Sequence, residues 1–505
     1  MNVNHTCALQ HNIDDWNSIK WSRIIYRVNR LQFRIAKAIW EGKWGKAKSL
    51  MFLITKSFDA KLLAVRRVTT NKGGSTPGVD NILWNTGEEK LQAAKNLKTR
   101  GYSPKPLKRV YILKKNGKKR PLGIPTLPDR AMQALFAIAL DPVSETTADP
   151  NSYGFRSHRS CADAIAQCFL ALCRKNSAQW IFEADIKACF DNISHQWIME
   201  HIPLNKTILY RWLKAGFIDG KIWKPTKQGT PQGGIISPTI MNMVMDGLET
   251  ALQKQFPRWK GKKVNFIRYA DDFIISADTK ETITEGIIPL VTSFLAQRGL
   301  SLSDEKSKIT HINDGFDFLS QNVRKYKGKL LIRPSRESVQ SFKNKFKSML
   351  KANRGIPAHA LIRLLNPVIR GWTNYHKGIC AKRCFSKLST FIFHQLRKWA
   401  KYQHGNKTYS WIFKRYFLLN HFQDIRTSPK GIYSYRLYRI GYVPIIYHVK
   451  VKSKANPFLK QYEKYFYLRK KWRKDIAKKC EQKTTFVKKV PNSRVSFRRE
   501  GLKSA

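Results

Sequence analysis

Near the N-terminus, hydrophobic and basic positions both recur with a helical period. Between Arg23 and Trp40 the two kinds of side chain return every three or four residues, with the basic ones a position earlier. The apolar set is Ile24, Val28, Leu31, Ile35 and Ile39, and the basic set is Arg23, Arg27, Arg30, Arg34 and Lys37. The spacing predicts a helix with adjacent apolar and basic faces. A row of one charge sign favours a phosphate-facing surface over an ordinary solvated face.

The pattern changes twice further along the chain. From about Leu97 to Ile312, short apolar runs of strand length alternate with helical patterns, which predicts a mixed α/β or α+β domain. After Arg333 the helical period dominates. Ser335 can cap one helix, and helical stretches follow at residues 357–376 and 385–402. This region is predicted to be a small helical domain.

The charge of the chain narrows the range of its candidate binding partners. The 505 residues include 94 Lys and Arg against 34 Asp and Glu, a formal net charge of +60. With 42% hydrophobic residues the chain is not expected to be disordered as a whole. A compact body with this charge repels itself, so it needs a polyanion. Nucleic acid is the first candidate and an anionic membrane surface the second.

Other sequence signals are weak. There is no run of about 18 apolar residues, so we expect no transmembrane helix, and the N-terminus carries no evident targeting signal. Of the eight cysteines, the close pairs Cys168/Cys173 and Cys380/Cys384 lack the second pair that a structural zinc site needs. We expect reduced thiols in a reducing compartment.

Three aspartates stand where the pattern predicts the ends of strands. Asp185 ends the apolar run that begins at Trp180, and Asp271 and Asp272 lie between two strand-like runs, at the expected turn of a hairpin. Asp is common in such turns for conformational reasons alone. In a chain with few acids, however, converging carboxylates favour a site for two divalent cations that clamp the oxygens of a phosphoryl transfer.

The residues around these aspartates resemble reverse transcriptases, and the group II intron-encoded family in particular. Tyr269-Ala-Asp-Asp272 is similar to that family's catalytic hairpin. The supporting motifs follow in the family's order: Thr76-Pro-Gly-Val-Asp80, Arg120-Pro-Leu-Gly-Ile-Pro125, Ser152-Tyr-Gly-Phe-Arg156, Phe190-Asp-Asn-Ile-Ser194, Gly229-Thr-Pro-Gln-Gly-Gly234 and Leu302-Ser-Asp-Glu-Lys306. Residues 366–375 and 399–417 are similar to its maturase domain.

The resemblance implies an α+β right-hand polymerase followed by an α-helical thumb. The expected parts are an N-terminal helical extension at 1–80, fingers and palm at 81–330, a thumb or maturase domain at 331–430, and a basic DNA-binding region at 431–505. Many relatives end in an endonuclease built on paired Cys and His. Because only Cys480 follows His448, we expect that domain to be absent or degenerate, without second-strand cleavage.

The resemblance also assigns the catalytic metal ligands. It implies that Asp185, Asp271 and Asp272 hold two Mg²⁺ ions, with backbone contacts from Ile186 and from Ala270. Asp272 is the weakest of the three as a direct ligand, because neighbouring side chains diverge. The ions would activate the primer 3′-hydroxyl and compensate the triphosphate charge.

The same resemblance assigns the dNTP contacts. Lys114 and Arg120 would grip the triphosphate, although another lysine of residues 115–119 could take either place. Phe190 would block a 2′-hydroxyl, and the alternative is a core Phe on the first turn of a helix. Gln232 would lie beside the sugar, in a loop whose glycines let the backbone approach the template or dNTP.

Basic residues of the helical domain are the expected nucleic-acid contacts there. Lys398, Lys414 and Arg415 stand among aromatic residues, a pattern that suits one packed face and one face that grips a duplex or structured RNA. Lys306 is a candidate contact to pyrophosphate, but a lysine on a solvated face is the simpler interpretation.

The sequence therefore predicts an RNA-directed DNA polymerase that is also a maturase. Its expected partners are group II intron RNA in a ribonucleoprotein, target DNA, an RNA template with a DNA primer, and dNTPs. The expected location is the bacterial cytoplasm or an organelle interior. The alternative is an RNA-binding splicing cofactor with an inactive polymerase. Retron-like or telomerase-like polymerases fit less well, and a membrane-surface protein fits least.

Overall fold

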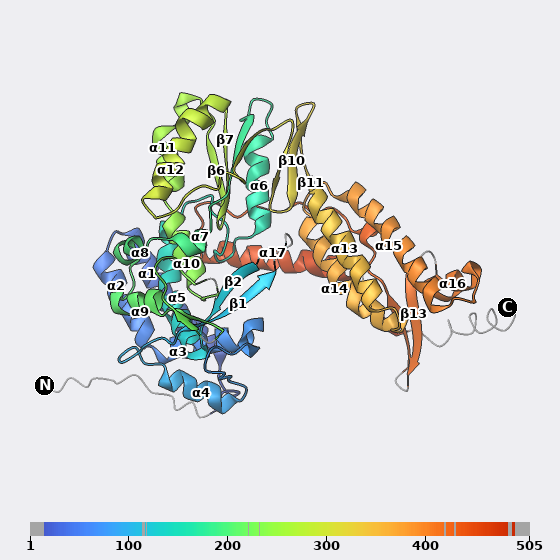
Figure 1. The fold of residues 1–505 in the computed structure, drawn as a ribbon, viewed down its shortest axis with the longest axis horizontal. Helices are drawn as coiled ribbons and strands as arrows, with labels where there is room; N and C mark the ends of the chain where they lie inside the picture. The colour runs from blue at the N-terminus through green and yellow to red at the C-terminus, as the bar shows by residue number, and fades with distance from the viewer. Residues whose placement is uncertain are drawn as a thin grey trace. The chain divides into compact units, whose positions relative to one another are not determined.

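A computed structural model describes residues 15–489, apart from 114–116, 118, 221, 232, 419–420, 429–430 and 483–486. The chain forms two compact units (Figure 1). The first comprises residues 1–160, 180–309 and 451–464, and the second comprises residues 161–179, 310–450 and 465–505. Each unit is assembled from separated segments, whereas the sequence predicts contiguous parts, and the predicted boundaries stay predictions.

The first unit combines helices with two sheets. Its helices are α1 (Trp21–Trp40), α2 (Trp44–Lys56), α3 (Phe58–Thr70), α4 (Gly87–Asn96), α5 (Leu127–Thr147), α7 (Cys189–Asn192), α8 (His195–His201), α9 (Lys206–Lys214), α10 (Ser237–Met245), α11 (Leu248–Gln255) and α12 (Ile288–Ala296). Its strands are β1 (Leu107–Leu113), β2 (Lys119–Ile124), β3 (Trp180–Ala184), β4 (Phe217–Asp219), β5 (Ile222–Lys224), β6 (Asn265–Tyr269) and β7 (Asp272–Ala277), and β8 (Lys308–His311) begins at its boundary with the second unit. The predicted α+β class is confirmed.

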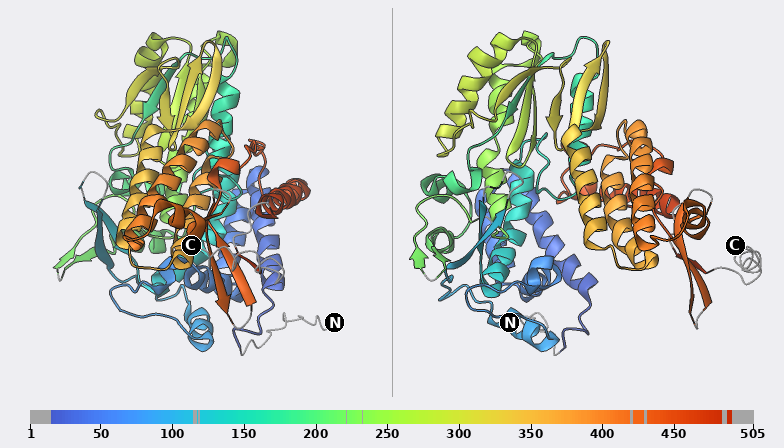
Figure 2. Two further views of the ribbon diagram at one scale, coloured as in Figure 1. Left: turned by 90° about the vertical axis from the view of Figure 1, so that its right-hand side faces the viewer. Right: turned by 45° about the vertical axis from the view of Figure 1, so that its right-hand side comes forward.

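The first unit contains two four-stranded sheets. One has the order β2-β1-β4-β5 and the other β6-β7-β3-β8. In the second sheet β7 pairs antiparallel with both β6 and β3. Helices α11 and α12 lie beside the β6–β7 hairpin in each view (Figures 1 and 2). This sheet carries the candidate chemistry at one of its edges.

A largely buried helix organises the core of the first unit. Residues 131–140 of α5 are all buried and, apart from Gln133, all apolar, and Ala131, Leu135 and Leu140 are 0% exposed. A helix that is apolar nearly all round belongs inside a protein core. Helix α1 packs on α5 through the predicted apolar stripe, of which Ile24 and Ile35 are buried. In the described part of the chain, no helix is both long and apolar enough to span a membrane.

The second unit is mainly helical. Its helices are α6 (Cys161–Leu172), α13 (Arg336–Ala352), α14 (Ala358–His376), α15 (Lys382–Gln403), α16 (Tyr409–Tyr416) and α17 (Glu463–Gln482), of which the first two residues of α17 fall in the first unit. Its strands are β9 (Phe316–Phe318), β10 (Gln321–Tyr326), β11 (Lys329–Pro334), β12 (Phe417–Leu418), β13 (His421–Ser428), β14 (Gly431–Arg436) and β15 (Val487–Lys489). Helices α13, α14 and α15 lie side by side (Figures 1 and 2). The predicted cap is confirmed, since the Ser338 amide donates to Ser335 Oγ at 3.1 Å.

Two polar residues that the sequence singles out are anchors within the second unit. The Asn366 side chain in α14 donates to the Arg436 carbonyl at 3.0 Å and accepts from the Tyr438 amide at 2.7 Å. His448 Nε2 lies 2.9 Å from an oxygen of Asp163, a fully buried carboxylate that also binds Arg469 at 2.6 Å. His448 is thus part of a buried ion-pair cluster.

Acid is expected to destabilise the second unit through His376. This side chain is 1% exposed, and its burial lowers its pKa to about 4. Because the folded pKa lies below the unfolded value of about 6.5, stability is full above pH 6.5 and is lost as the pH falls towards 4. Between pH 7 and pH 5 the loss is about 2 kcal/mol.

Urea unfolding of the full chain at the two pH values, followed by fluorescence of the second unit's tryptophans, measures this loss. His376→Gln is the matched variant, because it keeps a polar group near Ser338 Oγ, which lies 3.2 Å from His376 Nε2. An equal loss of stability in this variant would show that other groups cause the acid sensitivity.

Candidate active site

The three predicted aspartates meet at one edge of the β6-β7-β3-β8 sheet. Asp185 follows the last residue of β3, and Asp272 is the first residue of β7. Because Ala184 pairs with Phe273 across these strands, the chain brings Asp185 and Asp272 to the same end of the sheet. The predicted strand-end and hairpin positions are confirmed.

The turn that carries Asp271 is a two-residue hairpin turn. Tyr269 pairs with Asp272, so only Ala270 and Asp271 connect the two strands. Ala270 has φ of +60°, a left-handed conformation that glycine adopts more readily than alanine. A residue held in this region stores strain of about 1–3 kcal/mol, which the surrounding structure must offset.

The loop that leads into β8, the strand beside β3, fixes Asp185. The Ser303 amide donates to the Asp185 carbonyl at 2.8 Å, and the Asp185 amide donates to Ser307 Oγ at 3.3 Å. Ile186, the predicted backbone ligand, is buried and forms an isolated β-bridge with Leu302. The backbone on both sides of Asp185 is therefore held by residues 302–307.

Lys306 takes part in the site. Its Nζ lies 2.7 Å from Asp185 Oδ2, and its side chain is 65% exposed. The hydrogen bond to Asp185 raises the pKa of Lys306, with further contributions from Asp272 and Asp271. The simpler interpretation, a lysine on a solvated face, is therefore incomplete, because this lysine reaches the surface and also pairs with Asp185.

The donor set suits a hard divalent cation. Loss of hydration, followed by repulsion from Asp271 and Asp185, raises the pKa of Asp272 to about 6, although its side chain reaches the surface. The three carboxylates together carry more negative charge than Lys306 alone can neutralise. Mg²⁺ binds carboxylate oxygens and would compensate the remaining charge. Among the described residues, no three His, Cys, Asp or Glu side chains already form a metal-binding group.

The predicted triphosphate contacts are only partly described. Arg120 lies exposed in β2 opposite Ile112 of the antiparallel strand β1. Lys114 and Gln232 lie outside the described residues. The roles of these three side chains stay predictions.

Phe190 lies in helix α7. It is 8% exposed and belongs to the hydrophobic core of the first unit. Its carbonyl accepts from the Thr230 amide at 2.7 Å, which joins α7 to the glycine-containing loop. The ring therefore packs in the core, and its role toward the sugar stays a prediction.

The glycines of that loop approach the protein's own backbone. Gly229 has φ of +83°, and a Cβ there would lie 2.5 Å from the Asp191 carbonyl oxygen. A Cβ on Gly233, with φ of +125°, would lie 2.5 Å from the Gly123 oxygen. Close packing on α7 and β2 already requires glycine at both positions. The predicted approach of the backbone to a template or dNTP is therefore not needed to explain why glycine occupies positions 229 and 233.

The predicted nucleic-acid contacts differ in their surroundings. The five basic residues predicted on one face of α1, here called the α1 stripe, are all exposed. One of them, Arg27, binds Asp59 through two hydrogen bonds of 2.5 and 2.7 Å. In the second unit Lys398 and Lys414 are exposed, whereas Arg415 pairs with the buried Asp424 at 3.1 Å. Arg27 and Arg415 thus have partners within the chain that the sequence did not predict.

Two residues that support the turn at Ala270 and Asp271 were missed. Arg268 is 0% exposed, and a Cβ on Gly154 would lie 2.3 Å from the Ala270 nitrogen. A single charge inside the otherwise apolar strand Phe266-Ile-Arg-Tyr269 is the signal that could have identified Arg268. Gly154 lies in a quoted motif, but nothing local indicates its contact with the turn.

Three parts of the chain match protein-family models. Residues 112–323 match reverse transcriptase (RNA-dependent DNA polymerase), residues 16–97 match the N-terminal domain of reverse transcriptase, and residues 339–417 match the group II intron, maturase-specific domain. Asp185, Asp271 and Asp272 fall inside the first match.

Similar proteins agree with these matches. The chain is 32% identical over 300 residues to Protein YkfC of Escherichia coli (strain K12), covering 52% of this chain and 79% of that protein. It is 28% identical over 430 residues to the group II intron-encoded protein LtrA of Lactococcus lactis subsp. cremoris, covering 66% and 71%. A solved telomerase from Candida albicans, with 13% identity, coverage of 64% of each chain and a TM-score of 0.35, is too distant to carry an argument.

Proposed function

The chain belongs to the group II intron reverse transcriptase/maturase family, and from this premise we propose that it copies RNA into DNA at Asp185, Asp271 and Asp272. The observation that carries the proposal is the convergence of these carboxylates at one sheet edge, with Lys306 against Asp185. Primer extension on an RNA template by the purified full chain tests it. Template-dependent DNA synthesis that stops on removal of divalent cations is the expected result.

Mg²⁺ fits the site through the donor chemistry of its residues. We propose that Asp185 and Asp271 hold two ions, with Asp272 and the Ile186 carbonyl in supporting positions. When bound, the ions acidify the primer 3′-hydroxyl and neutralise charge on the triphosphate. The protein contributes an anionic edge, fixed by the loop at residues 302–307, so the carboxylates need little reorganisation.

The chain's own cations would position the substrate. Arg120 on β2 and Lys114 would bind the triphosphate, since a forked guanidinium and a point-charge ammonium suit phosphate oxygens. Lys306 would exchange its bond with Asp185 for a contact with the phosphates as the carboxylate is engaged. Gln232 would contact the sugar.

The maturase function is assigned to the second unit and the α1 stripe. The chain carries a net charge of +60, and its match to the maturase-specific domain covers residues 339–417. We propose that exposed Arg23, Arg30, Arg34, Lys398 and Lys414 contact phosphates of group II intron RNA. Target DNA is the proposed partner of the basic residues beyond 431.

Phe190→Val is expected to relax the choice between dNTP and NTP. An aromatic ring can exclude a 2′-hydroxyl, whereas the shorter valine side chain leaves room for it. We expect the preference for dNTP over NTP to fall by about 10–200-fold, as for a change of this size in a binding pocket. The ratio of kcat/KM values for a dNTP and the matching NTP measures it. Phe182→Val, in the same core with 2% exposure, is the control for lost packing. An unchanged ratio in Phe190→Val would contradict the sugar-excluding role.

The competing function is a splicing cofactor whose polymerase no longer works. It requires the same RNA-binding surfaces but no catalytic role for the three aspartates. The site geometry favours an active enzyme, because a surface used only for RNA gains nothing from carboxylates that would repel phosphates. Splicing activity without any primer extension would favour the cofactor.

A further inference from the structure

Arg268 is the largest side chain that the first unit buries completely. It is 0% exposed and lies on β6, two residues before Ala270 in the catalytic turn. Burial of a guanidinium costs several kcal/mol unless charges and hydrogen bonds compensate it. Its partners therefore show what the burial supports.

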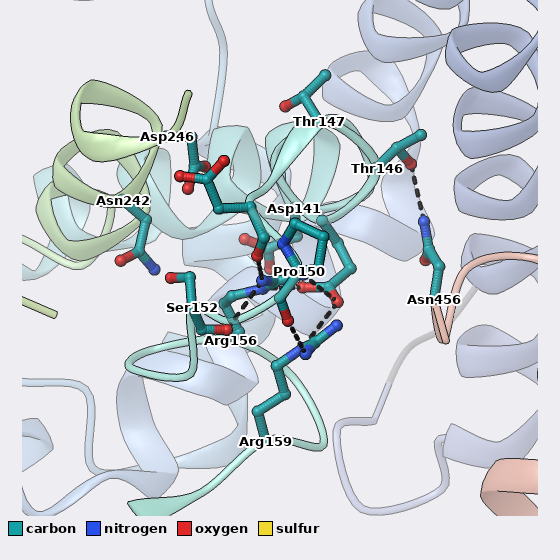
Figure 3. Close-up of polar contacts among 12 residues, drawn as sticks. Asp141, Thr146, Thr147, Pro150, Ser152, Arg156, Arg159, Asn242, Asp246 and Asn456 are labelled. Carbon is teal, nitrogen blue, oxygen red and sulfur yellow. Dashed lines mark hydrogen bonds and ion pairs between the residues drawn. The ribbon is translucent and has the colours of Figure 1, made fainter. Parts of the chain in front are cut away.

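The guanidinium joins the catalytic hairpin to helix α10. Nη2 donates to Asp246 Oδ1 at 2.5 Å, and Nη1 donates to Asn242 Oδ1 at 3.2 Å. Asn242 lies in α10 and Asp246 ends it (Figure 3). Nη1 also donates to the Ala270 carbonyl at 3.4 Å, so one side chain connects the end of this helix to the left-handed residue of the turn.

The opposite side of the turn is held by the loop around Gly154. The Tyr153 amide donates to the Arg268 carbonyl at 2.9 Å, and the Arg268 amide donates to the Asn151 carbonyl at 3.0 Å. Asn242 Nδ2 donates to the Gly154 carbonyl at 2.8 Å. The turn is therefore enclosed between the guanidinium and a glycine backbone that leaves no room for a side chain.

A second buried arginine stiffens this loop. Arg156 binds both carboxylate oxygens of Glu145, at 2.7 and 2.8 Å. It also donates to the Ser152 carbonyl at 2.9 Å (Figure 3). The loop cannot move away from the turn without breaking these bonds. The left-handed conformation of Ala270 is therefore imposed from two sides.

The Arg268–Asp246 pair is poorly optimised for stability. Arg268 Nε and Asp246 Oδ2 are buried and lack a hydrogen-bond partner among the described residues. A buried ion pair with unmet hydrogen bonds is often no better than apolar residues of the same volume. Its value to this protein therefore lies in what it positions.

We propose that Arg268 is a positioning residue that holds the turn at Ala270 and Asp271 so that Asp271 and Asp272 face Asp185 and bind the metal ions together. The proposal rests on the function proposed above. Arg268 reaches no substrate, because it is completely buried. Its effect is on metal affinity and on kcat, with primer–template binding left unchanged.

The test compares Arg268→Lys with the wild-type full chain. Lysine keeps a charge for Asp246 but cannot bind Asp246, Asn242 and the Ala270 carbonyl together. We expect Mn²⁺ binding, measured by electron paramagnetic resonance without substrate, to weaken at least about tenfold, and kcat to fall about 10²-fold, as for a misplacement of about 1 Å. The KM for primer–template should stay within about twofold, because the buried Arg268 takes no part in binding the primer–template.

A double variant separates positioning from stability. Arg268→Met with Asp246→Leu removes the pair but keeps its volume, so the chain should unfold at a similar temperature. Weakened Mn²⁺ binding in this folded variant supports the proposal, and unchanged Mn²⁺ binding and kcat overturn it. Arg130→Lys is the matched control. It perturbs another buried arginine, which binds the Pro125, Gly73 and Thr76 carbonyls, and should leave Mn²⁺ affinity unchanged.

The Mn²⁺ measurement also keeps this proposal distinct from the proposed function. If the wild-type chain binds Mn²⁺ but does not extend primers, the polymerase assignment fails while the comparison of Arg268 variants still holds. If the wild type binds Mn²⁺ no better than Asp271→Asn, the metal site itself is wrong and the positioning role is overturned with it.

Discussion

Asp271→Asn is expected to reduce RNA-templated primer extension by about 10³–10⁴-fold while intron RNA binding stays within about twofold. The substitution removes a charge from the cation site at nearly constant volume. The loss corresponds to several kcal/mol of transition-state stabilisation, at about 1.4 kcal/mol for each tenfold change. RNA affinity arises from cations elsewhere in the chain, so it should not follow the loss.

Single-turnover extension at saturating Mg²⁺ measures this effect. Asp314→Asn is a suitable control, because it removes one negative charge from an exposed turn in the second unit. Equal losses in both variants would indicate a general charge effect. Extension retained in Asp271→Asn would reject the assignment of this carboxylate to the metal site.

Intron RNA binding is expected to weaken by about 10³–10⁵-fold between about 50 and 200 mM salt. That range corresponds to roughly 6–10 phosphate contacts, each of which releases counterions from the RNA. The chain can supply this number, since its net charge is +60 and its basic helix faces are exposed. Filter binding or fluorescence anisotropy over a salt series, at fixed Mg²⁺, gives the slope.

The α1 stripe supplies an internal comparison for that slope. Arg30→Ala should reduce the slope by about 1, as expected for one phosphate contact. Arg27→Ala should change it less, because the Arg27 guanidinium already binds Asp59 at 2.5 and 2.7 Å. Equal changes in both variants would mean that the stripe acts only through its total charge.

The sequence predicted elements whose signals are local. The hairpin at Asp271 follows from two strand-like runs around a polar pair, and helix α13 follows from a capping serine before an apolar period. The family was recognised because motif order along the chain is itself a sequence property, and Asp185, Asp271 and Asp272 fall inside the reverse transcriptase match. These predictions required no knowledge of which distant residues meet.

Long-range contacts were beyond the same reasoning. Lys306 and Asp185 are 121 positions apart, and no local pattern predicts their hydrogen bond. Arg268 pairs with Asp246 across 22 positions, and its burial contradicts the usual preference of arginine for the surface. Helix α6 lies inside the predicted fingers and palm but belongs to the second unit. Tertiary packing alone determines these three features.

The central proposal is that a single chain is both polymerase and maturase. A paired assay of the purified full chain, at one stated salt and Mg²⁺ concentration, measures DNA synthesis on an RNA template and splicing of the group II intron that carries its reading frame. We expect both activities, with only the first lost in Asp271→Asn. Accelerated splicing by a wild-type chain that never extends a primer would contradict it.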